Sequence, residues 1–157
     1  MQALYTAIAT AVGGRNGTIK SSDGVLDHKL AYPRELGGPG GAATNPEQLF
    51  AAGYAACFEN ALLRVARERK QPIGESSVTA HVAIGRNEQG FFELAVELEV
   101  SVPGRHKAEI EQMVKIAHEE VCPYSRATRG NIEVKLRVAQ RSLGAGVDCC
   151  HKHDSNL

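Results

Sequence analysis

One segment constrains the fold more than any other: residues 44–69, with the sequence TNPEQLFAAGYAACFENALLRVARER. Asn45 is a typical N-cap, because its side chain can accept a hydrogen bond from a free N–H of the first turn. Pro46 suits the first helical position, where no N–H donor is needed. Glu47 adds a negative charge at the positive end of the helix dipole. The segment therefore predicts one long helix.

Cys57 lies in the middle of this helix, on a face of small and apolar side chains. The residues that share the face at helical spacing are Phe50, Gly53, Ala61 and Val65. Such a face packs closely against another element. A single cysteine in this setting is most often a buried packing residue. The helix alone therefore does not distinguish a structural cysteine from a reactive one.

The segments around the long helix alternate between apolar and polar residues, which is typical of half-buried strands. The expected elements are strands at 4–10, 18–20 and 25–30, the long helix, strands at 77–84 and 92–100, an amphipathic helix from about 104 to 122, and a strand at 132–138. Asp23-Gly24 marks a hairpin turn. This order predicts an α+β fold with a mostly antiparallel sheet. The long helix is small or apolar over much of its circumference, which hints at a dimer of packed central helices.

The length and the charge balance restrict the classes of function. A chain of 157 residues is expected to form one domain, here residues 1–140, followed by a mobile tail at 141–157 where the pattern dissolves. With 18 basic and 18 acidic residues, no charge excess points to nucleic acid or to an anionic membrane. No apolar run approaches the roughly 20 residues that span a bilayer, and the N-terminus does not resemble a signal peptide. We therefore expect a cytoplasmic protein.

Residues 31–44 are rich in glycine and proline and cannot join a helix or a central strand. Such a composition is typical of a flexible linker. This segment, however, is short and leads directly into the helix cap. We therefore expect an ordered loop beside the cysteine.

The chain has four cysteines, which in a reducing compartment indicate redox chemistry or metal binding more than structural disulfides. Cys57 and Cys122 each lie on or at the end of an amphipathic helix. A cysteine reacts as its thiolate, and burial on an apolar face opposes ionisation, so a nearby cation is needed. The candidate cations are Arg15, Arg34, Arg126 and Arg129.

Glu47 could hold one of these arginines in a bidentate ion pair. It precedes Cys57 by ten residues, which is roughly 15 Å along a straight helix. The two residues can belong to one site only if the helix breaks, for example near Gly53, or if a partner chain supplies one of them. Spacing alone leaves both routes open.

The chain resembles the organic hydroperoxide resistance (Ohr) proteins of the Ohr/OsmC family over residues 3–139. The resembling motifs are LYTAIATAVGGRNG, PRELGG, GGAATNPEQLFAAGYAACF and AHEEVCPYSRATRGNIEVKL. The resemblance implies an OsmC-like α+β fold, in which mostly antiparallel sheets wrap around central helices in an intertwined homodimer.

The resemblance also implies a thiol peroxidase that needs no metal, haem or other cofactor. Cys57 matches the peroxidatic cysteine and Cys122 the resolving cysteine. Arg15, in the GGR motif, matches the arginine that stabilises the thiolate and polarises the peroxide, and Glu47, in NPEQ, matches the carboxylate that orients it. A Cys57 sulfenic acid would form a disulfide with Cys122, and a dithiol such as the dihydrolipoyl group of a lipoylated protein would reduce that disulfide.

The implied substrates are alkyl and fatty-acid hydroperoxides. An apolar face around Cys57 would favour them over hydrogen peroxide, since burial contributes about 0.8 kcal/mol per CH₂. The implied role is a response to oxidative stress. The chain departs from the family pattern at Glu59, which we expect to point away from Cys57, and in its C-terminal extension.

Three alternatives remain at this point. The cysteine pair could serve as a redox sensor or relay without steady turnover. The tail residues Cys149, Cys150, His151 and His153 could bind a soft metal, although ligands so close in sequence rarely form a closed site alone. His118 could act as a base near Cys122, or it could be a histidine favoured by the helix dipole at a C-terminus.

Overall fold

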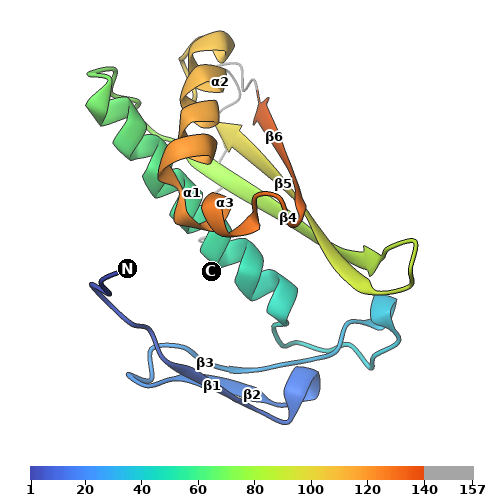
Figure 1. Cartoon of the computed structure of the whole chain (residues 1–157). Helices are drawn as coiled ribbons and strands as arrows, with labels where there is room; N and C mark the ends of the chain where they lie inside the picture. The colour runs from blue at the N-terminus through green and yellow to red at the C-terminus, as the bar shows by residue number, and fades with distance from the viewer. Residues whose placement is uncertain (140–157) are drawn as a thin grey trace, which may run out of the picture.

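The computed structural model describes residues 1–139, so the expected tail at 141–157 and its cysteines and histidines lie outside the described residues. The described part has two sheets and a long central helix (Figure 1). One sheet is formed by the first thirty residues, and the other, with a helical layer, by the second half of the chain. The α+β class predicted from the sequence is confirmed.

The N-terminal sheet contains β1 (Ala9–Val12), β2 (Thr18–Ser21) and β3 (Asp27–Lys29), in that order and antiparallel throughout. The predicted hairpin between β2 and β3 is present. The first strand begins at Ala9, later than the expected residue 4. Ala9 pairs with Ser21, the last residue of β2, so the residues before Ala9 have no partner strand in this sheet.

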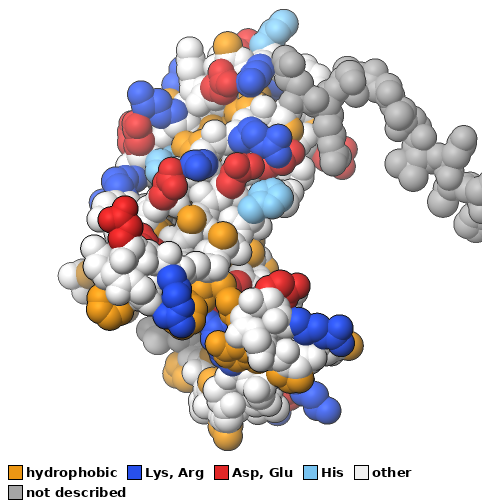
Figure 2. All heavy atoms as spheres, turned by 90° about the vertical axis from the view of Figure 1, so that its right-hand side faces the viewer, with side chains coloured by type: hydrophobic (Ala, Val, Ile, Leu, Met, Phe, Trp, Pro, Cys, Tyr) orange, Lys and Arg blue, Asp and Glu red, His pale blue; other side chains and the backbone are white. Residues whose placement is uncertain are grey.

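Neither face of this N-terminal sheet is fully covered by the described residues. None of residues 1–29 is buried, and the side chains of Leu4, Tyr5, Val12 and Val25 are all more than 60% exposed. Figure 2 shows hydrophobic side chains gathered on the surface of this part, which a hollow separates from the rest. A small sheet needs a packed hydrophobic face to be stable. The N-terminal sheet therefore presents apolar side chains that the rest of residues 1–139 does not bury.

The predicted long helix is α1 (Pro46–Glu68), which is unbroken over 23 residues. Asn45 caps it as expected, since its Oδ1 accepts a hydrogen bond of 2.8 Å from the Gln48 N–H. One face of α1 packs into the core and consists of Tyr54, Phe58, Ala61, Leu62, Val65 and Ala66. The other side of the helix remains more exposed, at Gln48, Ala52 and Ala56.

We expect the Asn45 cap to contribute measurably to stability. Asn45→Ala removes the acceptor for the Gln48 N–H and should lower the free energy of unfolding by about 1 kcal/mol. Urea unfolding at one fixed protein concentration would measure the change. Asn45→Asp, which keeps a capping oxygen, is the control and should unfold close to the parent. Equal stability of the alanine variant and the parent would contradict the prediction.

The second sheet has the order β4–β5–β6, from β4 (Ser77–Arg86), β5 (Phe92–Ser101) and β6 (Glu133–Ala139). β4 and β5 pair antiparallel, whereas β5 and β6 pair parallel. The parallel pair arises because the helical segment after β5 crosses over the sheet before β6. The sheet is thus mixed, although antiparallel pairs dominate the molecule. The alternate side chains of β5, Val96, Leu98 and Val100, enter the core against the helices.

The helical crossover differs from the prediction. The expected helix from about 104 to 122 is α2 (Lys107–Ile116), followed by a π-helical turn (Ala117–Val121). A further short helix, α3 (Pro123–Thr128), follows directly and is not among the expected elements. Pro123 occupies the first position of α3, where its missing N–H costs nothing. No helix within residues 1–139 is long and apolar enough to cross a membrane.

Candidate functional site

The structure brings Cys57 and Cys122 together. Cys57 comes from the middle of α1, and Cys122 from the junction between the π-helical turn and α3. Their sulfur atoms lie 3.8 Å apart, and both cysteines are free thiols. Cys57 is half-buried and Cys122 is buried. A disulfide has a sulfur separation of about 2.05 Å, so a small shift of either side chain would allow the bond to form.

The surroundings of Cys57 within one chain do not favour its thiolate. Burial raises the pKa of the Cys57 thiol above its usual value, the backbone N–H of Tyr124 lowers it, and the neighbouring Cys122 raises it again. Burial is the largest of these effects, because an apolar environment disfavours the charged form. A reactive Cys57 would therefore need a cation that residues 1–139 of its own chain do not place beside it.

Cys122 is also the N-cap of α3. Its Sγ accepts a hydrogen bond from the backbone N–H of Ser125 at 3.5 Å. The first turn of α3 thus directs N–H groups towards both sulfur atoms, that of Tyr124 towards Cys57 and that of Ser125 towards Cys122. The free N–H groups of a helix start provide weak stabilisation for a developing thiolate.

Arg15 and Glu47 form a second pair. Arg15 lies in a 3₁₀ turn (Gly14–Asn16) between β1 and β2, and Glu47 in the first turn of α1. Two hydrogen bonds of 2.7 and 2.6 Å join the guanidinium to the carboxylate. The hydrogen bond from Arg15 holds the pKa of Glu47 below its usual range, and the same bond raises the pKa of Arg15. Both groups therefore remain ionised at neutral pH, and the carboxylate holds the charged guanidinium in one orientation.

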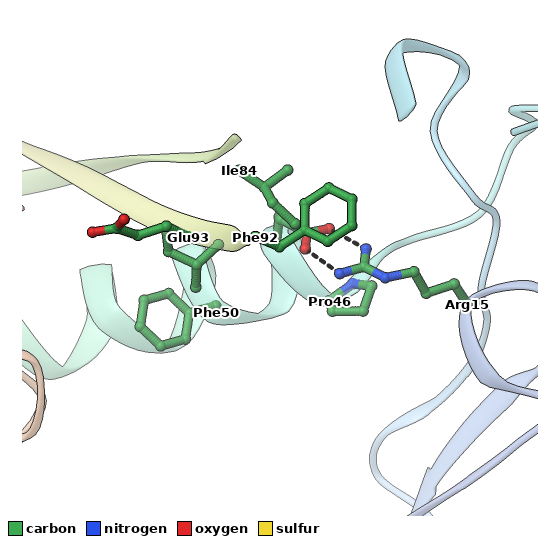
Figure 3. Close-up of a pocket in the computed structure, with 8 residues that line it drawn as sticks. Arg15, Pro46, Phe50, Ile84, Phe92 and Glu93 are labelled. Carbon is green, nitrogen blue, oxygen red and sulfur yellow. Dashed lines mark hydrogen bonds and ion pairs between the residues drawn. The ribbon is translucent and has the colours of Figure 1, made fainter. Parts of the chain in front are cut away.

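A pocket of about 280 Å³ opens beside this ion pair (Figure 3). Three charged residues, Arg15, Glu47 and Glu93, line part of the pocket. The apolar part of its lining is Pro46, Phe50, Ile84, Phe92 and Leu94. Arg15 reaches in from the N-terminal part of the chain, while the apolar residues come from α1, β4 and β5. The pocket can therefore hold a ligand with an alkyl or aryl body and a polar end.

One chain does not bring the two pairs together. A break near Gly53, one of the two routes that the spacing left open, is absent, because α1 continues through this residue, and Glu47 remains roughly 15 Å from Cys57 along the helix. Gly53 has a different use: a Cβ there would lie 3.0 Å from the Tyr124 Oη, so glycine allows the Tyr124 ring to approach α1. The two pairs could therefore share one site only if a second chain supplied one of them.

The other candidate arginines are engaged with backbone carbonyl groups. Arg34 donates to the Pro39 carbonyl. Arg126 donates to the Glu120 carbonyl, and Arg129 to those of His118 and Glu119. The glycine-rich loop at 31–44 is ordered as expected, but it lies beside Arg15, whose guanidinium carbon is 5.6 Å from the centre of the Tyr32 ring. The loop therefore supports the ion pair and not the cysteine.

Four polar residues behind Cys122 are joined by hydrogen bonds: Tyr54, His118, Ser125 and Thr128. Sequence reasoning singled out His118 but missed the other three. A possible signal was Tyr54, a hydroxyl-bearing residue on the helix face that the other side chains predict to be buried. Glu59 points away from Cys57 as expected and accepts a hydrogen bond of 2.7 Å from Ser76.

A metal site finds little support in the described part of the chain. His81, Glu97 and Glu99 lie close enough together to share an ion. Arg137, however, forms ion pairs with both carboxylates and so occupies oxygens that an ion would need. The cluster is on the face of the second sheet opposite to the core residues Val96, Leu98 and Val100.

Comparison with known proteins gives a consistent result. Residues 38–137 match the family of OsmC-like proteins. The organic hydroperoxide resistance protein of Xanthomonas axonopodis pv. citri is 58% identical over 137 residues, covering 87% of this chain and 95% of the relative. The organic hydroperoxide resistance protein OhrA of Bacillus subtilis is 50% identical over 145 residues, covering 88% of this chain and 99% of the relative.

Solved structures share the fold. An organic hydroperoxide resistance protein from Legionella pneumophila superposes with a TM-score of 0.83 at 52% identity, covering 88% of this chain and all of the other. One from Vibrio cholerae, with captopril bound in one of the active sites, has a TM-score of 0.81 at 51% identity, covering 88% of this chain and 94% of the other. The match to the family spans most of the described chain and includes both cysteines, so this chain belongs to the Ohr/OsmC family.

Proposed function

We propose that this protein is a cysteine-based peroxidase that reduces organic hydroperoxides to alcohols and so contributes to organic hydroperoxide resistance. The observation that carries the proposal is the 3.8 Å separation of the Cys57 and Cys122 sulfur atoms, in a chain whose relatives are named for this resistance. Two thiols at this distance can give up two electrons to a peroxide and form a disulfide, without metal or haem.

The proposed reaction has three steps. The Cys57 thiolate attacks the terminal oxygen of ROOH, the O–O bond breaks, and the alkoxide leaves as the alcohol after taking a proton. Cys122 then attacks the sulfur of the Cys57 sulfenic acid, and the hydroxyl group leaves as water with the proton of the Cys122 thiol. Finally a dithiol, such as the dihydrolipoyl group of a lipoylated protein, reduces the disulfide by thiol exchange.

The active unit in this proposal is a homodimer. The described residues leave the N-terminal sheet uncovered, and the outward side of α1 carries the small residues Ala52 and Ala56. A two-fold axis near Ala52 would pair two antiparallel α1 helices. Because 47 and 57 lie equally far from 52 in sequence, Glu47 of the partner subunit would then lie at the level of Cys57 along the helix pair.

Such a dimer would supply the cation that Cys57 lacks. The partner subunit's Arg15, held by the bidentate bond to the partner's Glu47, would lie over the Cys57 sulfur, counteract the effect of burial and polarise the peroxide. The same arrangement would place the apolar pocket beside the ion pair next to the reacting sulfur. Arg15 and Glu47 are thus proposed as site residues together with the two cysteines.

The first test is peroxide consumption by the reduced protein with excess dihydrolipoamide. Steady consumption of cumene hydroperoxide, well above that of hydrogen peroxide, would support an enzyme. Thiols that oxidise once and are not recycled by any dithiol would instead support a redox sensor or relay, which is the second candidate function.

The pocket predicts selectivity for the organic part of the peroxide. Both Phe91 and Phe92 are exposed in one chain, at 70% and 55%, but only Phe92 lines the pocket. Phe92→Ser should lower kcat/KM for a long-chain alkyl hydroperoxide by about tenfold and leave that for hydrogen peroxide nearly unchanged, because each lost CH₂ contact costs about 0.8 kcal/mol. Phe91→Ser is the matched control and should keep the parent's ratio. If Phe92→Ser also kept the parent's ratio of kcat/KM between the alkyl hydroperoxide and hydrogen peroxide, this pocket would be excluded as the substrate site.

A further inference from the structure

A buried polar network lies directly behind Cys122. The side chain of Ser125 is fully buried, and its Oγ is 3.0 Å from the Tyr54 Oη and 3.0 Å from the His118 Nδ1. The Tyr54 Oη is also 3.2 Å from the Thr128 Oγ1. These residues come from three different elements, α1, the π-helical turn and α3. The network therefore ties together the three segments that surround the cysteine pair.

The number of available protons sets the direction of each hydrogen bond. Thr128 donates its single hydroxyl proton to the Ser125 carbonyl, at 3.2 Å, because a carbonyl can only accept. The Thr128 Oγ1 must then accept from Tyr54. Tyr54 has no second proton, so its oxygen accepts from Ser125.

The same count extends to His118. The Ser125 hydroxyl has donated its only proton to Tyr54, and so it must accept from the His118 Nδ1–H. Burial and the charge of Arg129 lower the pKa of His118, which favours the neutral ring. His118 is thus a fixed donor at the end of a chain of hydrogen bonds.

This chain of bonds holds the turn that carries Cys122. The Ser125 backbone N–H donates to the Cys122 Sγ, so any movement of Ser125 moves the cap of α3 and the sulfur with it. Tyr54 lies three residues before Cys57 on α1, and its bond to Ser125 links the two cysteines through rigid backbone. Arg129 holds the His118 and Glu119 carbonyls, at 2.6 and 2.8 Å, and so fixes the π-helical turn.

We infer that Ser125, held by Tyr54 and His118, is a positioning residue that keeps Cys122 aimed at Cys57 and thereby sets the rate of disulfide formation. The inference rests on the proposed peroxidase function. In the step concerned, the S–S bond forms, the S–O bond of the Cys57 sulfenic acid breaks, and the hydroxyl leaves as water with the Cys122 proton. Ser125 and Tyr54 are fully buried, so a peroxide that enters from solvent does not reach them. The network therefore acts on this second step and leaves the first one unchanged.

The test compares two rates in one rapid-mixing experiment with cumene hydroperoxide and the reduced homodimer. Chemical trapping follows the Cys57 sulfenic acid, and mass spectrometry of quenched samples follows the disulfide. Ser125→Ala and His118→Leu should slow disulfide formation by at least about tenfold, because small displacements of a reacting group carry large rate penalties. Formation of the sulfenic acid should stay within about twofold of the parent. Sulfinic acid at Cys57 should accumulate at high peroxide, because the unresolved sulfenic acid is exposed for longer.

Two further variants separate positioning from a loss of packing. Tyr54→Phe keeps the buried ring and removes only the hydroxyl, so it should fold and still slow the second step. His118→Asn restores an N–H donor close to the Nδ1 position and should recover most of the parent's rate. His81→Leu, on an exposed strand position, is the matched control and should behave as the parent.

The possible results lead to different conclusions. Disulfide formation at the parent's rate in both Ser125→Ala and Tyr54→Phe would overturn the inference. Equal slowing by His118→Asn and His118→Leu would overturn the role of the His118 donor. If the parent itself forms no sulfenic acid at Cys57, the proposed peroxidase function fails, and that result is distinct from either of the others.

Discussion

Replacement of Cys57 by serine is expected to abolish turnover of organic hydroperoxides, with a loss of at least about 10³-fold in kcat/KM. A serine hydroxyl does not ionise near neutral pH and cannot attack the peroxide oxygen as a thiolate does. The substitution is nearly isosteric, and Cys57 is only half-buried, so the fold should remain intact. Peroxide consumption with excess dihydrolipoamide measures the loss, and circular dichroism checks the fold.

Cys122→Ser is the informative companion to this variant. It keeps the peroxidatic thiol and removes the partner at 3.8 Å, so a single oxidation should still occur with the alcohol as product. The sulfenic acid would then persist and proceed to sulfinic acid at high peroxide. Substantial turnover by Cys57→Ser would place the nucleophile elsewhere. If Cys122→Ser were recycled as efficiently as the parent, Cys122 would not be the resolving cysteine.

Replacement of Arg15 by alanine is expected to lower kcat/KM for an organic hydroperoxide by about 10²–10³-fold, the usual cost of removing a fixed charge that stabilises a transition state. Burial raises the pKa of Cys57, and the proposal assigns to Arg15 the charge that opposes this rise. The pH at which the thiolate appears, followed by its ultraviolet absorbance, should therefore move upward in the variant. Arg15→Lys should restore little of the lost kcat/KM, because lysine cannot form the bidentate bond to Glu47.

Arg126→Ala is the matched control for the loss of an arginine. Arg126 is exposed and bonds only the Glu120 carbonyl, at 3.4 Å, so its removal should leave activity close to the parent's. A large loss of activity in Arg126→Ala together with normal activity in Arg15→Ala would contradict the assignment of the cation to Arg15.

Mixed dimers decide which chain supplies the arginine. A heterodimer of Cys57→Ser and Arg15→Ala chains, purified through two different tags, would contain one intact site if Arg15 acts on the cysteine of its partner. It should then have about half of the parent's activity per dimer. If each site came from one chain, both sites of the heterodimer would be defective, and activity would stay near that of the homodimeric variants.

The elements with strong local signals were predicted well. The cap, the first-turn proline and the apolar spacing placed α1 within two residues of its observed ends. The alternation of β4 and β5 likewise placed their buried faces. The signal was weak where structure depends on distant pairing: the first strand starts only where β2 offers a partner, and α3 is too short to show helical periodicity.

For the site, the sequence by itself named the candidate residues: two cysteines on helices, Glu47 in the first turn of one of those helices, and four arginines. The family resemblance singled out Arg15 among the four. Only the tertiary structure decided how they meet, since 65 residues separate Cys57 from Cys122 and 32 separate Arg15 from Glu47. It also showed that α1 does not bend to join the two pairs. The physical reason is that spacing along a chain governs local backbone bonds and helix faces. The approach of distant side chains depends instead on how whole elements pack against one another.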